Sequence, residues 1–416
     1  MLKYKTSSAS HKLPVNSPLA MQERNMSQAA IPAVYMRGGT SKGVFFRADS
    51  LPSDPAIRDK LLLRVMGSPD PYGQQIDGMG GATSSTSKVI VVAPSSTSDC
   101  DVDYSFGQVS VDKPVIDWAG NCGNLTSAVG PFAIAQGIIT APQQGTATVR
   151  LRHRELNARI VVHIPMQNGS VVEDGDFELD GVTFPAAEII VEFLNPSNES
   201  AGASLFPTGS PLDVLDVPGV GLVDVTMINA GNPAVFIAAE QIGLHGDEMQ
   251  KDINSSPGLL ATLEAIRSHA AVRMGLAATP EEATAVRLHT PKIAFLAKPS
   301  RYTASNGIVI EPFTINFNAR IVSMGKLHHA MTGTGAIALA SASAIPGTIV
   351  QRFLGASQTR ITFGHPSGTM TAGAEVEPNG DSWTITKAVM SRSARRLMEG
   401  RVLVPTRLLQ PETSAQ

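Results

Sequence analysis

The sequence has few cysteines, few aromatic residues and little excess charge of either sign. Cys100 and Cys122 are too few for a disulfide framework, or for an iron–sulfur cluster held by this chain alone. With 33 Lys and Arg against 36 Asp and Glu, the net charge of -3 leaves no basic excess for nucleic acid. No stretch approaches the roughly 20 apolar residues that span a bilayer. These absences favour a protein of the reducing cytoplasm that binds neither nucleic acid nor membrane.

The chain has enough apolar material for two ordinary domains or one large two-lobed one, since 43% of its 416 residues are hydrophobic. Residues before about Ile31 are polar and Ser-rich, which predicts a disordered tail, or an upstream extension if the true start is Met21 or Met26. The composition shift in LNPSNESAGASLFPT is the best domain boundary. The predicted organisation is a tail at 1–30, an N-terminal lobe at 31–205, a C-terminal lobe at 206–397, a terminal strand returning to the first lobe at 398–406, and a tail at 407–416.

Short β-branched runs alternate with turn clusters, a pattern typical of an antiparallel-rich α+β protein. The runs are AVYMRGG, SKVIVVAP, ATVRLRH, ARIVVHIP, VEDGDFELDG, KIAFLAKP and DSWTITKAVM. Two small-residue helices, 122–137 and 333–344, are too uniformly apolar for the surface, so each is predicted to be wrapped by strands. A further surface helix is expected within 246–273. The sequence therefore predicts two similar lobes, each a curled, mostly antiparallel sheet around a central helix.

The starts of the two small-residue helices are candidate anion sites. Free N–H groups and the helix dipole favour a carboxylate there, and two such ends facing across a cleft would hold one small polycarboxylate. Each dipole supplies only about 0.3–1 kcal/mol at the surface, so cationic side chains are needed as well. Cys122 at the first start is a candidate acid or base, although a small buried hydrophobe is an equal alternative. Cys100 does not lie at a predicted helix start, so it is interpreted as structural.

Several cations lie in Gly- and Ser-rich loops. The loop MRGGTSKG places Arg37, Thr40, Ser41 and Lys42 around adjacent glycines, where backbone amides and two cations can wrap an anion. A plain turn is the alternative, and no Walker sequence closes the loop. Lys88 follows GGATSSTS and opens a strand. Its ammonium could point along the preceding loop, but the sequence pattern alone favours a solvated lysine at a strand end.

The string SMGKLHHAMTGTGA in the second half supplies Ser323, Lys326, His328 and His329 ahead of the second helix. Adjacent histidines do not share a helix face, so no zinc site is predicted. His365, beside a turn proline, is interpreted as structural.

Five strings, MRGGTSKGVFF, IDGMGGATSSTSK, DWAGNCGNLTSAVG, SMGKLHHAM and FGHPSGTM, together resemble the 2-methylaconitate cis-trans isomerase (PrpF) family. The resemblance runs from about Ile31 to Val404. It implies a fold like that of diaminopimelate epimerase, with two pseudo-symmetric lobes and the active site between them. In such epimerases each lobe contributes one cysteine at a helix start. Here the first is kept as Cys122, but the second helix begins TGTGA, so a two-thiol mechanism is excluded.

The resemblance instead implies that Lys88 and Cys122 form the acid/base pair, without a cofactor or a metal. The implied reaction converts trans-2-methylaconitate into the cis form in the 2-methylcitrate cycle of propionate breakdown, ahead of an aconitase-type hydratase. Lys88 is assigned the proton abstraction and Cys122 the delivery, with the reverse assignment open. The expected substrate-binding residues are Arg37, Thr40, Ser41, Lys42, Ser85, Ser87, Gly123, Asn124, Lys292, Ser323, Met324, Lys326, His328, Gly333, Thr334 and Gly335.

Alternatives within the same fold are 3-methylitaconate isomerase and 4-oxalomesaconate tautomerase, which move a double bond by the same proton chemistry. An alternative of another class is a non-catalytic polycarboxylate-binding protein that uses the same helix ends. The sequence leaves the oligomeric state open, with a homodimer as one option.

Overall fold

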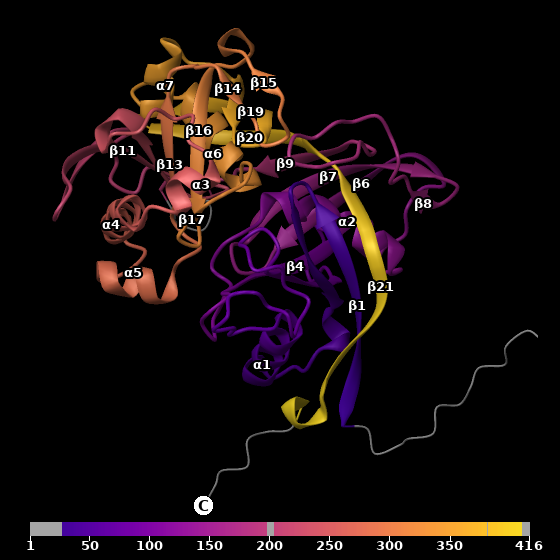
Figure 1. Ribbon diagram of the computed structural model, residues 1–416. Coiled ribbons are helices and arrows are strands. Elements are labelled where there is room, and N and C mark those ends of the chain that lie inside the picture. The colour runs from indigo at the N-terminus through magenta and orange to yellow at the C-terminus, as the bar shows by residue number, and fades with distance from the viewer. Residues whose placement is uncertain (1–26, 198–203, 381, 410–416) are drawn as a thin grey trace, which may run out of the picture.

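Short β-branched segments dominate the fold, as the sequence pattern predicts. The computed structural model describes residues 27–197, 204–380 and 382–409, and within them the strands join into one 19-stranded network and one separate two-stranded pair. Few helices accompany the strands, so the fold is mixed α/β (Figure 1). Most of the predicted tails, 1–26 and 410–416, lies outside the described residues, as does 198–203 at the predicted domain boundary.

In the first half of the chain, strands surround helix α2 (Gly123–Ala135), which contacts most of them. β3 is parallel to β2 and antiparallel to β4, and β4 is parallel to β6. A second helix, α1, lies outside this layer. The elements are β1 (Gln28–Gly38), β2 (Ser41–Arg47), α1 (Pro55–Met66), β3 (Lys88–Pro94), β4 (Val102–Val109), β5 (Ile116–Asp117), β6 (Gln144–His153), β7 (Ala158–Gln167), β8 (Ser170–Val171) and β9 (Ile189–Leu194).

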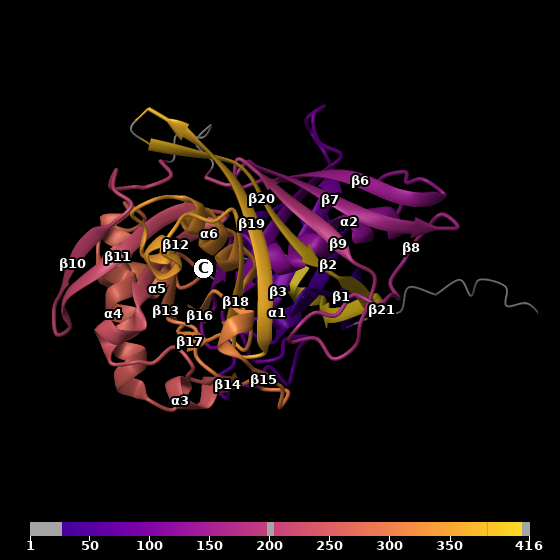
Figure 2. The same ribbon diagram turned by 90° about the horizontal axis from the view of Figure 1, so that it is seen from above.

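In the second half, strands surround helix α6 (Gly333–Ala344) in the same manner (Figure 2). The remaining helices lie on the outside of this half or follow α6 along the chain. The strands are β10 (Asp213–Val217), β11 (Gly221–Ala230), β12 (Asn232–Ala238), β13 (Lys292–Ala297), β14 (Tyr302–Thr303), β15 (Val309–Ile310), β16 (Phe317–Ser323), β17 (Lys326–Leu327), β18 (Arg360–His365), β19 (Gly368–Asn379) and β20 (Ser382–Arg392). The helices are α3 (Gln250–Asn254), α4 (Pro257–Arg273), α5 (Pro280–Val286) and α7 (Ile349–Leu354).

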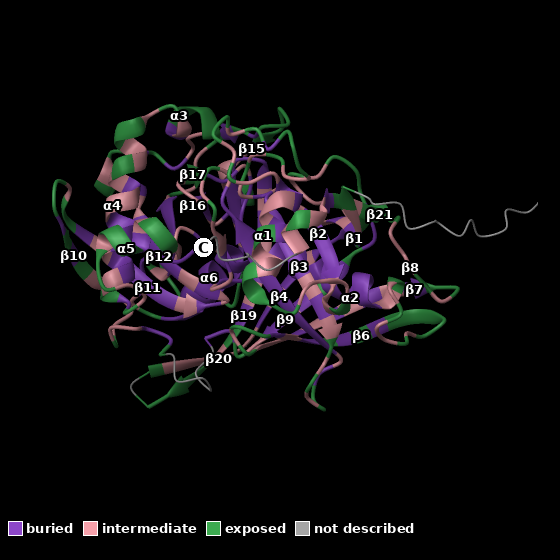
Figure 3. Cartoon of the chain, turned by 90° about the horizontal axis from the view of Figure 1, so that it is seen from below, coloured by how far each residue is buried: buried purple, intermediate pink, exposed green. Residues whose placement is uncertain are grey.

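α2 and α6 lie at the two predicted central helices, and both are buried (Figure 3). Every residue of α6 is buried, and so are residues 123–133 of α2. Their Gly, Ala and Ser side chains are small enough for strands to approach from several sides. Larger side chains of the strands, such as Phe45 and Phe236, complete the same core cluster. No helix in the described ranges is long and apolar enough to cross a membrane.

The run VEDGDFELDG was expected to be a strand, and that expectation is wrong. Residues 172–181 contain one isolated bridge, from Phe177 to Ala186. Acidic side chains of this segment bind backbone groups elsewhere instead. The Glu173 carboxylate accepts from the Arg396 amide at 3.1 Å, and the Asp180 carboxylate accepts from the Thr369 amide at 2.6 Å.

The last strand, β21 (Ala394–Pro405), returns to the first half and pairs antiparallel with β1 along its whole length (Figure 1). The register joins Gln28 to Pro405 at one end and Gly38 to Ala394 at the other. Residues 28–30, predicted as tail, are therefore part of a strand. The returning strand also begins before residue 398, where the sequence places it.

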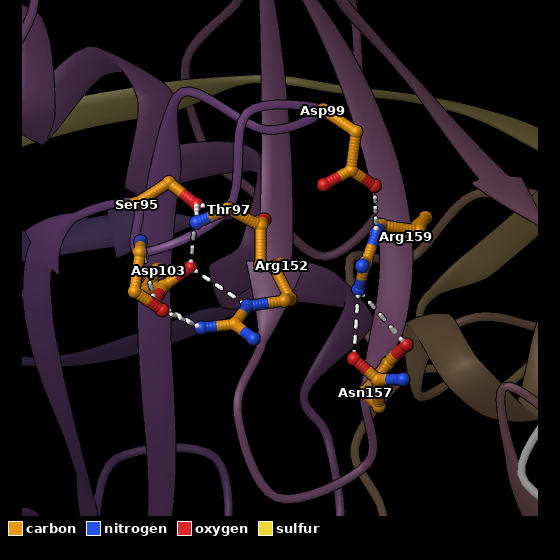
Figure 4. Close-up of polar contacts among 8 residues, drawn as sticks. Ser95, Thr97, Asp99, Asp103, Arg152, Asn157 and Arg159 are labelled. Atoms are coloured by element: carbon orange, nitrogen blue, oxygen red, sulfur yellow. Dashed lines mark hydrogen bonds and ion pairs between the residues drawn. The ribbon is translucent and has the colours of Figure 1, made fainter.

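A polar cluster fixes the loop 95–101 to the sheet of the first half (Figure 4). Asp103 accepts hydrogen bonds from Ser95 Oγ at 2.8 Å and from Arg152 Nε at 2.9 Å. Burial raises the pKa of Asp103, but these hydrogen bonds outweigh it and hold the pKa at about 2. At the tip of the loop, Arg159 Nε donates to Asp99 at 2.7 Å. The loop is thus held by charged hydrogen bonds at neutral pH.

Candidate active site

Cys122 is the residue that caps the start of α2. Its sulfur accepts a hydrogen bond from the Leu125 amide at 3.5 Å and lies 3.9 Å from Ser41 Oγ. The Asn121 side chain accepts from the Cys122 amide at 2.7 Å and so holds the turn before the helix. The thiol is buried, with 8% of the residue exposed. The sequence places it correctly at a helix start.

Lys88 lies beside this thiol, although it opens a strand and the sequence pattern alone favours a solvated lysine there. It is 4% exposed, and Nζ donates to Gln108 Oε1 at 2.5 Å and lies 5.0 Å from the centroid of the Phe106 ring. Burial lowers the pKa of Lys88, while Cys122 raises it through its charge and a hydrogen bond; the net direction is downward. An amine with a lowered pKa is closer to acting as a base at neutral pH.

Lys292 is a second buried lysine close to the first. Its Nζ contacts His289 Nδ1 at 3.2 Å and donates to the His289 carbonyl at 2.9 Å and to Ser323 Oγ at 3.1 Å. Burial, followed by repulsion from the Lys88 ammonium, lowers the pKa of Lys292 to about 7. This lysine therefore titrates in the physiological range.

The starts of α2 and α6 meet directly, where the sequence predicts that they face each other across a cleft. A Cβ atom added at Gly333 would lie 2.7 Å from backbone atoms of Gly123 and Asn124, so only glycine permits this approach. Asn232 joins the two starts. Its side chain bonds both the amide and the carbonyl of Asn121 at 2.8 Å, and donates to Thr334 Oγ1 at 3.1 Å.

Neutral histidines surround the two lysines. Burial and the charges of Lys292 and Lys88 lower the pKa of His289 well below its usual value. Burial also lowers the pKa of His328, helped by His329 and Lys88. Ser85 Oγ lies 3.0 Å from His328 Nε2 and 3.1 Å from His329 Nδ1. Among the described residues, no group of three or more His, Cys, Asp or Glu could hold a metal ion.

A cavity of about 1180 Å³ opens beside these groups and contains many of the predicted binding residues. Those in its wall are Arg37, Thr40, Ser41, Lys42, Ser85, Ser323, Met324, Lys326 and His328. The others are not in the wall: Lys88, Cys122, Ser87, Gly123, Asn124, Lys292, Gly333, Thr334 and Gly335. The predicted residues thus form two groups, one that lines the cavity and a buried one made of lysines and helix starts.

Two predicted binding residues make structural contacts instead of facing the cavity. Ser87 is fully buried and donates to Gln75 Oε1 at 2.7 Å, within the loop that precedes β3. The Gly335 amide donates to Thr332 Oγ1 at 3.1 Å, which caps the start of α6. Arg37 lies in the wall, but one of its nitrogens is already held by the carbonyls of Gly39 and Ser393, both at 3.0 Å.

Sequence reasoning missed several polar residues of this site, among them Gln108, Asn232, His289 and Arg392. Arg392 is 2% exposed, and its Nε donates to Asn124 Oδ1 at 2.9 Å. Burial lowers its pKa to about 10, and the charge of Cys122 opposes this shift. It lies in the string MSRSARRLMEG, and nothing in that string marks this arginine as the buried one.

Lys88, Lys292 and Arg392 bring buried positive charge to one place without a salt bridge to any described carboxylate. A buried cation is costly unless it is paired, so such a cluster is stabilised when an anion enters it. The contacts described above are all with neutral groups or with the Cys122 sulfur. The site is thus suited to a small molecule that carries several negative charges.

The family model described as "PrpF protein" matches residues 28–405. The chain belongs to the PrpF family. Its PrpF relatives include a Shewanella oneidensis protein named 2-methyl-aconitate isomerase, 54% identical over 91% of this chain and 98% of the relative. A Cupriavidus necator protein of the same name is 52% identical over 92% of this chain and 98% of its own.

More distant relatives carry a different name. A 3-methylitaconate isomerase from Eubacterium barkeri is 37% identical over 91% of this chain and 98% of its own. The solved structure of a methylitaconate-delta-isomerase matches this PrpF chain with a TM-score of 0.73 at 35% identity, covering 94% of this chain and all of the other. A hydroxyproline epimerase from Agrobacterium vitis shares the fold, with a TM-score of 0.51 at 11% identity over 91% of this chain and 94% of its own.

Proposed function

We propose that this PrpF protein is an isomerase that converts trans-2-methylaconitate into cis-2-methylaconitate. The observation that carries the proposal is the buried Lys88 amine in contact with the Cys122 thiol, at a point where two helix starts meet and no carboxylate of the described residues forms an ion pair with the amine. The names of the relatives that are 54% and 52% identical point to the same substrate.

The chemistry avoids rotation about an intact double bond. Lys88 removes a proton from the methylene that carries a carboxylate, and the electron pair spreads over the neighbouring carbons and carboxylate oxygens. The former double bond becomes a single bond and turns, and a proton then returns to the methylene carbon. Cys122 is proposed as the partner of Lys88 in this exchange. No redox or group-transfer step is involved, so no cofactor is required.

The developing negative charge needs oriented donors, and the site supplies them. The helix starts present N–H groups and the positive ends of two dipoles, and Lys292 and Arg392 add charge nearby. In a preorganised, water-poor site a single donor is worth about 2.7–4 kcal/mol to an anionic transition state. The same donors also bind the carboxylates of the substrate before proton removal. Only the interaction free energy that is added after proton removal lowers the activation barrier.

The arrangement in two lobes, the place in metabolism and the cellular compartment are proposals too. We propose that the halves around α2 and α6 are two pseudo-symmetric lobes, and that the product passes to an aconitase-type hydratase in the 2-methylcitrate cycle. The two unpaired cysteines favour a reducing, cytoplasmic setting.

The test is a substrate panel with the purified full-length chain, followed by proton NMR: trans-2-methylaconitate, 3-methylitaconate and 4-oxalomesaconate. The proposal requires the highest kcat/KM for trans-2-methylaconitate, with cis-2-methylaconitate as the product. A higher value for either other substrate would reassign the enzyme within the family. Tight binding without any turnover would identify a polycarboxylate-binding protein.

The role of Lys88 is tested by Lys88→Met, which keeps most of the side-chain volume. Deuterium entry from D2O into the methylene of the trans isomer should fall by about 100-fold or more, the usual contribution of a positioned base. Full exchange in this variant would eliminate Lys88 as the abstracting group.

A further inference from the structure

The pairing of strands around α2 is repeated around α6. β3 is parallel to β2, antiparallel to β4, and β4 is parallel to β6. In the second half β13 is parallel to β12, antiparallel to β16, and β16 is parallel to β18. In each half the central helix lies, in chain order, between the last two strands of this series; β6 follows α2 directly, whereas α7 comes between α6 and β18. Residues of the two halves can therefore be compared position by position.

Lys88 and Lys292 occupy the same position in this repeat. Each is the first residue of the strand that is parallel to its neighbour, and each is buried, with 4% and 3% exposed. Each also donates to a neutral side chain at the corresponding place on the adjacent antiparallel strand, Gln108 for Lys88 and Ser323 for Lys292. The fold thus holds two equivalent buried amines.

The helix caps are equivalent too, but their chemistry differs. Cys122 caps α2 through its sulfur, and Thr332 caps α6 through its hydroxyl, which accepts from the Gly335 amide. A threonine hydroxyl does not ionise near neutral pH, so it is no acid or base in the sense that a thiol is. Lys292 and Thr332 of the second half thus correspond to Lys88 and Cys122 of the first. Of these two, Lys292 is the one that can exchange a proton.

The two amines share one electrostatic environment. The charge of Lys88 acts on Lys292, and both charges act on His289 and on His328. Ser323 is a residue of the cavity wall, and its Oγ lies 3.1 Å from the Lys292 amine. The amine is therefore one hydrogen bond away from the cavity. The remaining charged or titratable groups that act on Lys292 are Cys122, Asp117 and Arg267.

We propose that Lys292 is a second catalytic acid/base, which gives a proton to the methylene carbon after Lys88 has removed one from the trans isomer. The inference rests on the proposed function and changes one part of it: Cys122 remains the hydrogen-bond partner of Lys88 but does not deliver the proton. In the reverse direction Lys292 removes the proton from the cis isomer and Lys88 returns it.

The protons balance over the cycle. The neutral Lys88 amine takes H+ from the C–H bond and becomes an ammonium, while the electron pair delocalises into the carbon skeleton. After rotation the Lys292 ammonium gives H+ to the same carbon and becomes a neutral amine, and the double bond re-forms. Proton exchange with water restores the starting state. Because the two buried ammonium groups repel each other, a state with one charged and one neutral amine is favoured.

The experiment follows deuterium entry at the methylene from pure trans and pure cis 2-methylaconitate separately, with the full-length chain in D2O. We expect Lys292→Met to keep exchange into the trans isomer within about tenfold of the unchanged enzyme, and to lose exchange into the cis isomer by about 100-fold or more. Lys88→Met should show the reverse pattern. Isomerisation should fall by about 100-fold or more in both.

Three outcomes would overturn the proposal. Equal loss of both exchanges in Lys292→Met would make Lys292 a binding residue, and unchanged isomerisation would leave Lys88 acting alone. Selective loss of cis exchange in Cys122→Ser, instead of Lys292→Met, would assign delivery to the thiol. The matched control is Lys298→Met, an exposed lysine just beyond the other end of β13, which should leave every rate unchanged.

Two further measurements keep the result interpretable. If Lys292→Met is insoluble, Lys292→Gln is used, because an amide can still donate to Ser323. The enzyme without substitutions should exchange the cis isomer at a rate that rises with pH through about 7, where Lys292 loses its proton; a flat rate across this range would contradict the proposal. If that enzyme neither exchanges nor isomerises 2-methylaconitate, the proposed function itself fails, whatever Lys292 does.

Discussion

Gln108 is the neutral side chain that holds the Lys88 amine by a hydrogen bond. Its Oε1 accepts from the Lys88 amine at 2.5 Å, and its Nε2 is held by the Ser87 carbonyl at 3.0 Å, so the acceptor cannot turn away. A neutral acceptor stabilises the ammonium form and opposes the effect of burial, which lowers the pKa.

Replacing Gln108 should therefore shift the pH dependence of proton removal. In Gln108→Met the pKa of Lys88 falls further, so the acidic limb of the pH–rate profile for trans exchange moves to lower pH. In Gln108→Glu a carboxylate stabilises the ammonium, and the limb moves to higher pH. Measuring both profiles checks the prediction; shifts in the same direction would show that Gln108 acts through packing.

Asn232 is the residue whose loss should cost the most hydrogen bonds at the helix starts. Asn232→Ala leaves the buried Asn121 amide without its partner, at about 1–3 kcal/mol, and removes the shorter of the two contacts to the Asn121 carbonyl, which His289 Nε2 still approaches at 3.3 Å. Urea unfolding should show a loss of about 2–4 kcal/mol. Asn229→Ala, which removes one hydrogen bond to the Ser204 carbonyl at 2.8 Å on a half-buried strand, is the control and should cost about 1 kcal/mol.

At the scale of single residues, the sequence does not reveal which side chains the fold brings to the site, as Asn232 and Gln108 show. Cys122 could be predicted because a polar turn followed by a long apolar run marks a helix start. Lys88 was ambiguous because burial of a strand's first residue depends on the neighbouring strands. Gln108, Asn232 and Arg392 join the site through contacts with residues more than 15 positions away, and no local pattern records such contacts.

The contact between α2 and α6 depends on glycine at both helix starts. Gly333→Ala should force these backbones apart, because the new Cβ would lie 2.7 Å from atoms that cannot move as a side chain would. Overpacking of this kind costs about 1–3 kcal/mol, and we expect kcat to fall because the donors at both starts shift. Gly258→Ala in α4 is the control, since nothing lies within 4 Å of its Cβ; its stability should be unchanged or higher by up to about 1 kcal/mol. Equal effects of both variants would contradict the prediction.

Central helices were easier to predict than other elements. α2 and α6 have long apolar runs of small residues, and no strand of ordinary length has that composition. α1 was not predicted, although Asp54 caps it, Pro55 opens it and Gly67 ends it in the left-handed region. The segment 172–181 alternates in polarity as a strand would, but its acidic side chains bind backbone groups of β19 and β21 instead. Such tertiary contacts override local pattern.

Several buried histidines make the whole molecule sensitive to acid. Burial lowers the pKa of His153 to about 3, against the smaller opposing effect of a hydrogen bond to the Gly120 backbone. The unfolded chain takes up a proton below the ordinary pKa of about 6.5, whereas the folded chain does not until about pH 3. Stability is thus fully present above about pH 6.5 and falls as the pH drops, by up to about 1.4 kcal/mol per pH unit for each such histidine. His289, His328 and His365 act in the same direction.

Urea unfolding between pH 6.5 and pH 4.5 checks this prediction. His153→Gln removes one titrating group, so the loss of stability per pH unit should be smaller than in the unchanged chain. His245→Gln, at an exposed position, should leave the slope as it is. A slope unaffected by His153→Gln would mean that this histidine takes up a proton in the folded state as readily as in the unfolded one.

The pairing of β21 with β1 has a consequence for how the protein is made. β1 leaves the ribosome first, and its neighbour on this side leaves last, more than 350 residues later. Until β21 has been synthesised, the nascent first half therefore carries an open strand edge that other polypeptides can join. The emergence of β21 is the event that closes this edge, so the exposed side of β1 stays without its partner while more than 350 residues are added.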